Sequence, residues 1–131
     1  MDYAAIRREL AARLENVDGV VAVYDAAPDR VVTPSIAVLP GEPFAEYHIT
    51  HGGLIALLFD VVVFAQRFDT VAGQNVLDDL ISAIPAAVVT DQSLAGTAQV
   101  VKVDSASNYG LVTVGDDTYL GCRFLIEVHA T

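Results

Sequence analysis

A Gly-Asp-Asp tripeptide, Gly115-Asp116-Asp117, is the part of this sequence that most directly suggests chemistry. The same tripeptide occurs at the metal-binding hairpin of many viral RNA polymerases, where a carboxylate pair holds Mg²⁺ for phosphoryl transfer. Such a site also needs a further acid from another element and a basic surface for nucleotide phosphates, and the sequence indicates neither. Because Gly and Asp tolerate the positive φ of tight hairpins, we interpret the tripeptide as the turn between two strands.

A second candidate site combines His48 and His51, in the stretch His-Ile-Thr-His, with Glu46 as a third ligand. The two histidines have the spacing of metal ligands on a helix. They lie, however, in a polar stretch bounded by glycines, residues 41–53, which we interpret as an extended loop or hairpin arm. The expected state is a solvated loop with two ordinary histidines, and a small metal-dependent enzyme or binding module is the alternative.

Cys122 and Asp60 are isolated candidates. Cys122 could act as a nucleophile beside a histidine, but it lies in the middle of a predicted strand, on the apolar face, where a small thiol packs well. Asp60 interrupts an apolar run, so its carboxylate must be paired or hydrogen-bonded, with Arg67 or Arg123 as partner. We expect a structural or inter-subunit ion pair there.

No motif in the sequence demands an enzyme. There is no Walker loop, no glycine-rich dinucleotide fingerprint, no HExxH and no GxSxG. The prediction is therefore a protein with no catalytic residues, no metal and no cofactor.

The composition favours one domain over residues 1–131 and a partner chain. Hydrophobic residues make up 53% of the sequence and charged residues only 18%. So few charges leave apolar surface that we expect to be buried against another chain. The formal net charge is −10, and residues 31–131 hold eleven acidic but only three basic residues. This acidic surplus argues against tight binding to DNA or RNA, which relies on clustered Lys and Arg.

The sequence also favours a soluble intracellular protein. Cys122 is the only cysteine, so no intrachain disulfide can form, and a reducing compartment fits. The N-terminus lacks the basic and apolar regions of a signal peptide. The longest apolar run, Leu54–Ala65, is too short for a membrane helix and contains Asp60.

A helix is predicted over residues 3–17, with Asp2 as N-cap and Gly19 as the stop. Its apolar side chains fall on one face: Tyr3, Ile6, Leu10, Leu14 and Val17. Strands are predicted over 20–24 and 35–39, the second closed by a turn at Pro40-Gly41.

The apolar run 54–65 is predicted as a strand buried on both faces, with a partner subunit covering the second face. A second helix should follow from a cap at Thr70, and Pro85 should end it or start a separate short helix over about 86–93. Its apolar stripe is formed by Leu77, Leu80, Ile81 and Ile84, and Asp78 and Asp79 are expected on the solvent-facing side.

The remainder is predicted as three strands, over 97–103, 109–114 and 118–128. The last has the clearest pattern, with period-two alternation that places one set of side chains in the core: Leu120, Cys122, Phe124, Ile126 and Val128. The resulting order, α-β-β-β-α-β-β-β, indicates an α+β fold with two helices packed on one face of a mainly antiparallel sheet.

Two stretches carry a resemblance to a known family. They are "IRRELAARLENVDGVVAVYDAAPDRVVTPSIAVLPGE" (6–42) and "NYGLVTVGDDTYLGCRFLIEVHA" (108–130). Read together, they resemble the small tail terminator proteins of long-tailed bacteriophages of actinobacteria. The shared features are an opening helix, "VYD…P", "P…AVLPGE", a long central strand, a helix, and a closing "NYG…VGD…YLG". The stretch 41–53 has no counterpart in that pattern.

The resemblance implies a non-enzymatic assembly protein of the virion tail, assembled in the host cytoplasm. Tail terminators form a hexameric ring on the last ring of the tail tube protein, stop its growth and present the surface for the head–tail connector. DNA would pass through the acidic lumen without specific binding. In that setting we expect Asp60, Asp116 and Asp117 at contacts between subunits or rings. Another neck or tail component, such as a head-closure or tube protein, is the nearest alternative.

Overall fold

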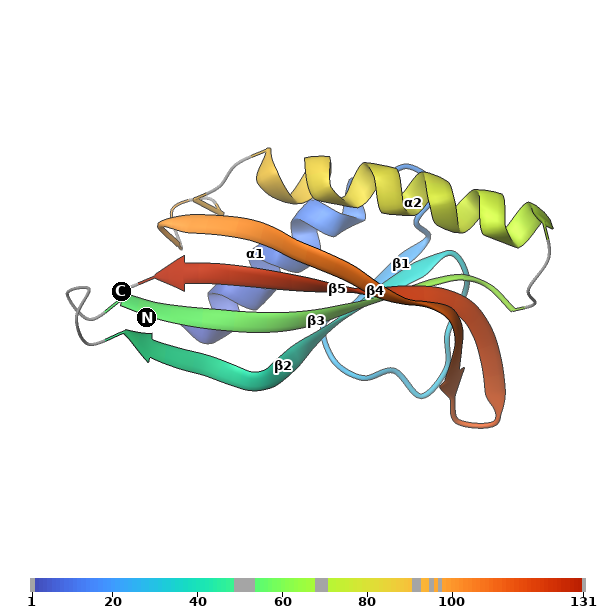
Figure 1. Ribbon diagram of the computed structural model, residues 1–131, viewed down its shortest axis with the longest axis horizontal. Helices are drawn as coiled ribbons and strands as arrows, with labels where there is room; N and C mark the ends of the chain where they lie inside the picture. Colours follow the sequence, from blue (N-terminus) through green and yellow to red (C-terminus); the bar gives the residue numbers. More distant parts are fainter. Residues whose placement is uncertain are drawn as a thin grey trace.

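The computed structural model of the chain describes residues 2–48, 54–67, 71–90, 93, 94, 96 and 98–130. Two helices and five strands follow one another along it: α1 (Tyr3–Glu15), β1 (Ala22–Tyr24), β2 (Ser35–His48), β3 (Leu54–Gln66), α2 (Val71–Val89), β4 (Val100–Val114) and β5 (Asp117–Ala130). The strands form one sheet in the order β1-β2-β3-β5-β4, in which only β1 and β2 run parallel. Both helices lie on one face of the sheet (Figure 1), so the predicted α+β architecture is confirmed.

α1 begins as predicted, because the Asp2 side chain accepts a hydrogen bond from the Ala5 amide at 3.0 Å. The helix ends at Glu15, two residues before the predicted end. Val17 nevertheless stays buried in the core, and Gly19 turns the chain with a φ of +88°. The apolar face of this segment therefore continues past the last helical residue.

α2 corrects the prediction at Pro85, which neither ends the helix nor begins a new one. Proline removes one helical hydrogen bond, but the buried stripe continues beyond it to Val88, and this burial holds the next turn against the sheet. Thr90 closes the helix by donating its hydroxyl to the Ala86 carbonyl at 2.7 Å. The proposed cap Thr70 lies outside the described residues. Neither described helix has the length and hydropathy to cross a membrane.

The main core fills the space between the helices and the sheet. Alternate residues of the two central strands face it, which confirms the alternation predicted for the last strand: Leu57, Phe59, Val61 and Val63 from β3, and Leu120, Cys122, Phe124, Ile126 and Val128 from β5. Burial of such aliphatic and aromatic side chains is worth about 1.5–3 kcal/mol each. This layer fixes which face of β3 and β5 each polar residue occupies.

The predicted turn at Pro40-Gly41 is wrong, because β2 continues through it to His48. The pairing with β3 shifts register between Pro40 and Ala45, so the chain bulges and then pairs again. Gly41 fits only because it lacks a side chain: a Cβ there would lie 2.8 Å from the Leu58 carbonyl oxygen. Local turn propensity was overridden by the long neighbouring strand.

The two strands predicted over 97–103 and 109–114 are one strand, β4, so the sheet has one strand fewer than expected. Register shifts after Val103 and after Ser107 interrupt its pairing with β5, and Asn108 adopts a φ of +56°. These irregularities fall in a polar stretch at the edge of the sheet. Pairing with β5 on both sides of the irregular stretch joins the two predicted strands into one, and no local sequence pattern indicates this pairing.

The second face of the sheet carries no helix, yet part of it is buried by the chain itself. Ala37, Val62, Phe64 and Tyr119 form a small apolar cluster there, and Val31, from the 25–34 segment, packs on it. The Phe64 and Tyr119 rings meet edge to face with centroids 5.7 Å apart. The predicted burial of β3 on both faces is therefore confirmed, and the chain itself supplies cover that the prediction assigned to a partner subunit.

Gly121 allows β5 to pass close to β3 where the β4–β5 hairpin leaves the sheet. A Cβ at Gly121 would lie 2.0 Å from the Val63 carbonyl oxygen. Gly110, which pairs with Gly121, has open space where its own Cβ would be. Beyond this pair the hairpin extends past the other strands and curves away from the helices (Figure 1).

We expect Gly121→Ala to lower the free energy of unfolding by about 3 kcal/mol, because the added methyl forces the two central strands apart. Gly110→Ala is the matched control, and its effect should stay within about 0.5 kcal/mol. Urea unfolding of both variants measures the difference. Equal stability of the two variants would contradict the close approach.

Candidate functional site

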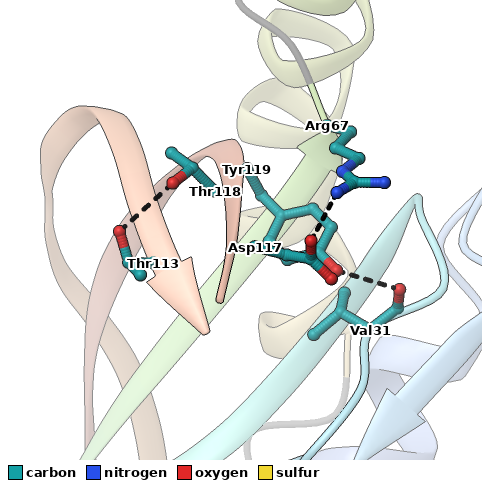
Figure 2. Close-up of polar contacts among 6 residues, drawn as sticks. All are labelled: Val31, Arg67, Thr113, Asp117, Thr118 and Tyr119. Atoms are coloured by element: carbon teal, nitrogen blue, oxygen red, sulfur yellow. Dashed lines mark hydrogen bonds and ion pairs between the residues drawn. The ribbon is translucent and has the colours of Figure 1, made fainter. Parts of the chain in front are cut away.

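The Gly-Asp-Asp stretch forms the tip of the β4–β5 hairpin, as predicted. Gly115 and Asp116 make a two-residue turn between the paired residues Val114 and Asp117, and Gly115 has a φ of +60°. Positive φ at the first turn residue is typical of the hairpin turns that favour glycine. The hydroxyl oxygens of Thr113 on β4 and Thr118 on β5 lie 3.4 Å apart, one on each strand beside the turn (Figure 2).

The two carboxylates of the tip have different surroundings. Asp117 forms an ion pair with Arg67, which follows the end of β3 (Figure 2). Asp116 is exposed. Within the described part of the chain, no three His, Cys, Asp or Glu side chains gather as a metal site would require. The geometry is thus that of a turn tied to the sheet through Arg67.

Asp60 pairs with Arg123, one of the two predicted partners, at 2.7 Å. The pair lies on the helix-free face and is only partly buried, with 26% of the Asp60 side chain and 41% of the Arg123 side chain exposed. Both residues belong to the same chain. A contact of Asp60 with another subunit stays a prediction.

The alternative metal site falls largely outside what the structure describes. Glu46 is exposed on β2, and His48 is the last residue of that strand. The His48 side chain and the whole of His51 are outside the described residues. Of the two interpretations of 41–53, the hairpin arm is confirmed for residues 41–48, which continue β2 and pair antiparallel with β3, and the loop is wrong for them.

Cys122 occupies the predicted position on the apolar face of β5 and is buried. Burial raises the pKa of its thiol to about 11, because the thiolate would lose its hydration. A thiol held in the neutral form is a poor nucleophile. Its role is packing.

A polar ladder on the helix-free face was missed by the sequence reasoning. It consists of Lys102 and Asp104 on β4 with Glu127 and His129 on β5. Lys102 Nζ lies 3.3 Å from Glu127 and 3.6 Å from Asp104, and His129 Nε2 lies 2.9 Å from Glu127. The alternation of β5 put Glu127 on this face, but only the β4–β5 register reveals its partners.

The ladder shifts the protonation of its members in opposite directions. Burial raises the pKa of Asp104, and the hydrogen bond and charge of Glu127 raise it further. Burial acts in the same direction on Glu127, but hydrogen bonds from Asp104 and Lys102, together with nearby positive charge, lower its pKa overall. Asp104 therefore holds a proton to higher pH than its neighbour.

An open hollow of about 210 Å³ lies on the same face, between the 25–34 segment and the β4–β5 hairpin. Its lining is almost wholly apolar apart from Arg123 and Thr113: Ala27, Pro28, Ala37, Leu39, Val62, Phe64, Val112 and Val114. Two tyrosines hold the covering segment in place. The Val32 amide donates to the Tyr24 hydroxyl at 3.2 Å, and Tyr119 donates to the Val31 carbonyl at 3.4 Å (Figure 2).

We expect Asp104→Asn to stabilise the protein by about 0.5 kcal/mol at pH 7, since like charges on neighbouring strands are destabilising. A raised carboxyl pKa means that stability falls as the pH rises through the ordinary value toward the folded one. The gain should therefore vanish at pH 3. Urea unfolding at both pH values measures it.

Glu127→Gln is the opposite case and serves as the comparison. A lowered pKa means that the contribution of Glu127 is present above its ordinary value and is lost as the pH falls through the folded one. This variant should therefore be less stable than the parent at pH 7. A stabilised Glu127→Gln, or a destabilised Asp104→Asn, would contradict the ladder.

A scan against models of known protein families found no match, and a search of curated proteins found none either.

Proposed function

We propose that this protein is a structural subunit of a phage or prophage tail that assembles into a ring, as a tail terminator does. In this role it caps the tail tube, ends tube growth and provides the surface that joins the head. The sequence resemblance suggested this role, and the shape and surface of the chain support it.

The observation that carries the proposal is the exposure of large apolar side chains at the edges of the sheet. Val21 and Val32, near β1, are 60% and 63% exposed, and Leu111 on β4 is 62% exposed. Tyr47 on β2 is 68% exposed. Apolar residues gathered at strand edges are typical of chains that pair with neighbouring subunits.

The described surface offers less to an enzyme. The hollow between the 25–34 segment and the β4–β5 hairpin is open, has few polar groups and is lined mainly by aliphatic side chains. In the more polar hollow beside it, the Asp60 and Arg123 side chains are paired with each other. The titratable groups of the face are engaged with one another in the Asp60–Arg123 pair and the Lys102–Glu127 ladder. Substrate sites usually combine an apolar pocket with convergent polar groups.

The net charge of −10 supports a ring through which DNA passes. An acidic wall repels phosphates and so lets DNA slide without binding. The acids at the hairpin tip and on α2 are the groups that would face DNA or the next ring: Asp78, Asp79 and Asp116, which are exposed, and Asp117, which is partly exposed.

Two measurements test the proposal. Electron micrographs of the purified protein, alone and mixed with assembled tail tubes, should show rings at tube ends. In the virus that carries the gene, loss of the chain should give overlong tails. Tails of normal length that fail to join heads would instead assign the protein to head closure. Stoichiometric Zn²⁺ or Fe²⁺ in a persistent monomer, lost in His51→Ala, would favour the metal-dependent alternative.

Changing Asp116 and Asp117 together to Asn should weaken ring or ring-to-tube assembly and leave folding intact. The Arg67–Asp117 pair is exposed, so its loss should cost less than about 1 kcal/mol of unfolding free energy. Thermal unfolding and counting of capped tubes separate the two effects. Normal capping by the double variant would remove the tip from the assembly surface.

A further inference from the structure

The five strands share one row of directly paired residues, and this row ends at two open edges. It runs from Ala22 on β1 through Ser35, Phe64 and Gly121 to Gly110 on β4. β1 and β4 are the outermost strands of the described sheet. Each therefore directs alternate backbone N–H and C=O groups away from the sheet.

The two edges are built to accept a strand. Neither Val20–Tyr24 nor Gly110–Val114 contains a charge or a proline, which are the usual protection of an edge strand. The remaining open edge, on β2 beyond the short β1, does carry such protection in Pro40 and Pro43. The prolines on the β2 edge hinder pairing with another strand, whereas the β1 and β4 edges leave such pairing open.

The directions of the strands fix how two copies could join. β2 is antiparallel to β3, β3 to β5 and β5 to β4, so β4 runs opposite to β2 and to β1. A second copy placed beside the first by rotation about an axis along the strands would therefore bring its β1 antiparallel to β4. Antiparallel pairing needs no crossover and is the more stable arrangement.

The side chains at the two edges match on the same face. Leu111 pairs with Leu120, and Val21 precedes Ala22 by one residue, so both point to the helix side of the sheet. Both are more than half exposed. An open hollow of about 170 Å³ lies beside β1, lined by Glu15 and Val20–Val23, and it can receive a side chain from a neighbouring strand.

Electrostatics limits where another copy of this chain can approach. Two copies, each with a net charge of −10, repel one another over most of their surfaces. They can approach most closely where neither is charged, and both edge segments are uncharged. Because the β1 and β4 edges differ, the contact is head-to-tail and repeats from copy to copy, which gives a ring when the rotation between copies closes.

We propose that the Gly110–Val114 edge of β4 pairs antiparallel with the Val20–Tyr24 edge of β1 in a second copy, with Gly110 beside Ala22 and Leu111 beside Val21. This extends the sheet from subunit to subunit. The inference deepens the proposed function, since it rests on the ring and names the contact that builds it.

Disulfide trapping between two singly substituted proteins tests the contact. Leu111→Cys protein is mixed with Val21→Cys protein carrying a tag of different size, and the mixture is oxidised. The expected product is a cross-linked pair containing one copy of each, because a disulfide requires Cα atoms within about 7 Å. The parent protein is the blank, since its only thiol, Cys122, is buried.

The control pair replaces Val21→Cys by Tyr47→Cys, a thiol at a position on β2 that is at least as exposed as Val21. Cross-linking of Leu111→Cys with Val21→Cys should exceed the control at least about tenfold, as expected for a distance-limited bond. Equal yields would overturn the proposal. Efficient cross-linking of Leu111→Cys with itself would also overturn it, in favour of a two-fold contact between β4 edges.

Light scattering and micrographs of the same samples test the tail function and the β1–β4 contact separately. Rings without the Leu111–Val21 cross-link would refute the contact and leave the ring. Cross-linked chains that never cap tail tubes would support the contact and refute the tail function. Leu111→Lys, placed at an exposed position, should fold normally and lose self-association, and its retention of the parent's mass in solution would contradict the contact.

Discussion

β3 and β5 pair along almost their whole length at the centre of the sheet, and the other elements take their places from this pair. One face of the two strands supplies the floor on which α1 and α2 pack. The other face carries the Asp60–Arg123 pair and the small cluster around Phe64. Gly121 lets the two strands pass closely enough for the β4–β5 hairpin to curve out of the sheet. The shape of the proposed assembly surface thus depends on one close backbone contact.

The helix-free face combines two kinds of surface that sequence patterns do not separate. Near the hairpin it is apolar and partly covered by the 25–34 segment. Further along β5 it becomes a ladder of charges centred on Glu127. Because the charged groups are paired within the chain, they contribute little free attraction to a partner. The uncharged strand edges remain as the places where a second acidic chain can approach.

Whether the Gly-Asp-Asp stretch could bind a metal ion depends on which residues surround it in the fold. Two adjacent carboxylates could hold a metal ion only if a third ligand converged on them. In the fold they stand at the end of a projecting hairpin, where Asp117 meets Arg67 and Asp116 meets solvent. Two glycines shape this region. Gly115 allows the tight turn, and Gly121 allows the close approach to β3 from which the hairpin bends away from the core.

The sequence by itself determined the elements with strong periodicity. The alternation of β5, the apolar stripe of α2 and the cap at Asp2 depend on local spacing, so they were readable without the fold. Tertiary structure decided the rest: the passage of β2 through Pro40, the fusion of two predicted strands into β4, and the partners of Glu127 and Asp60. These features depend on register between strands that are distant in sequence. Local propensity is weaker than the hydrogen bonds and burial that a long neighbouring strand provides.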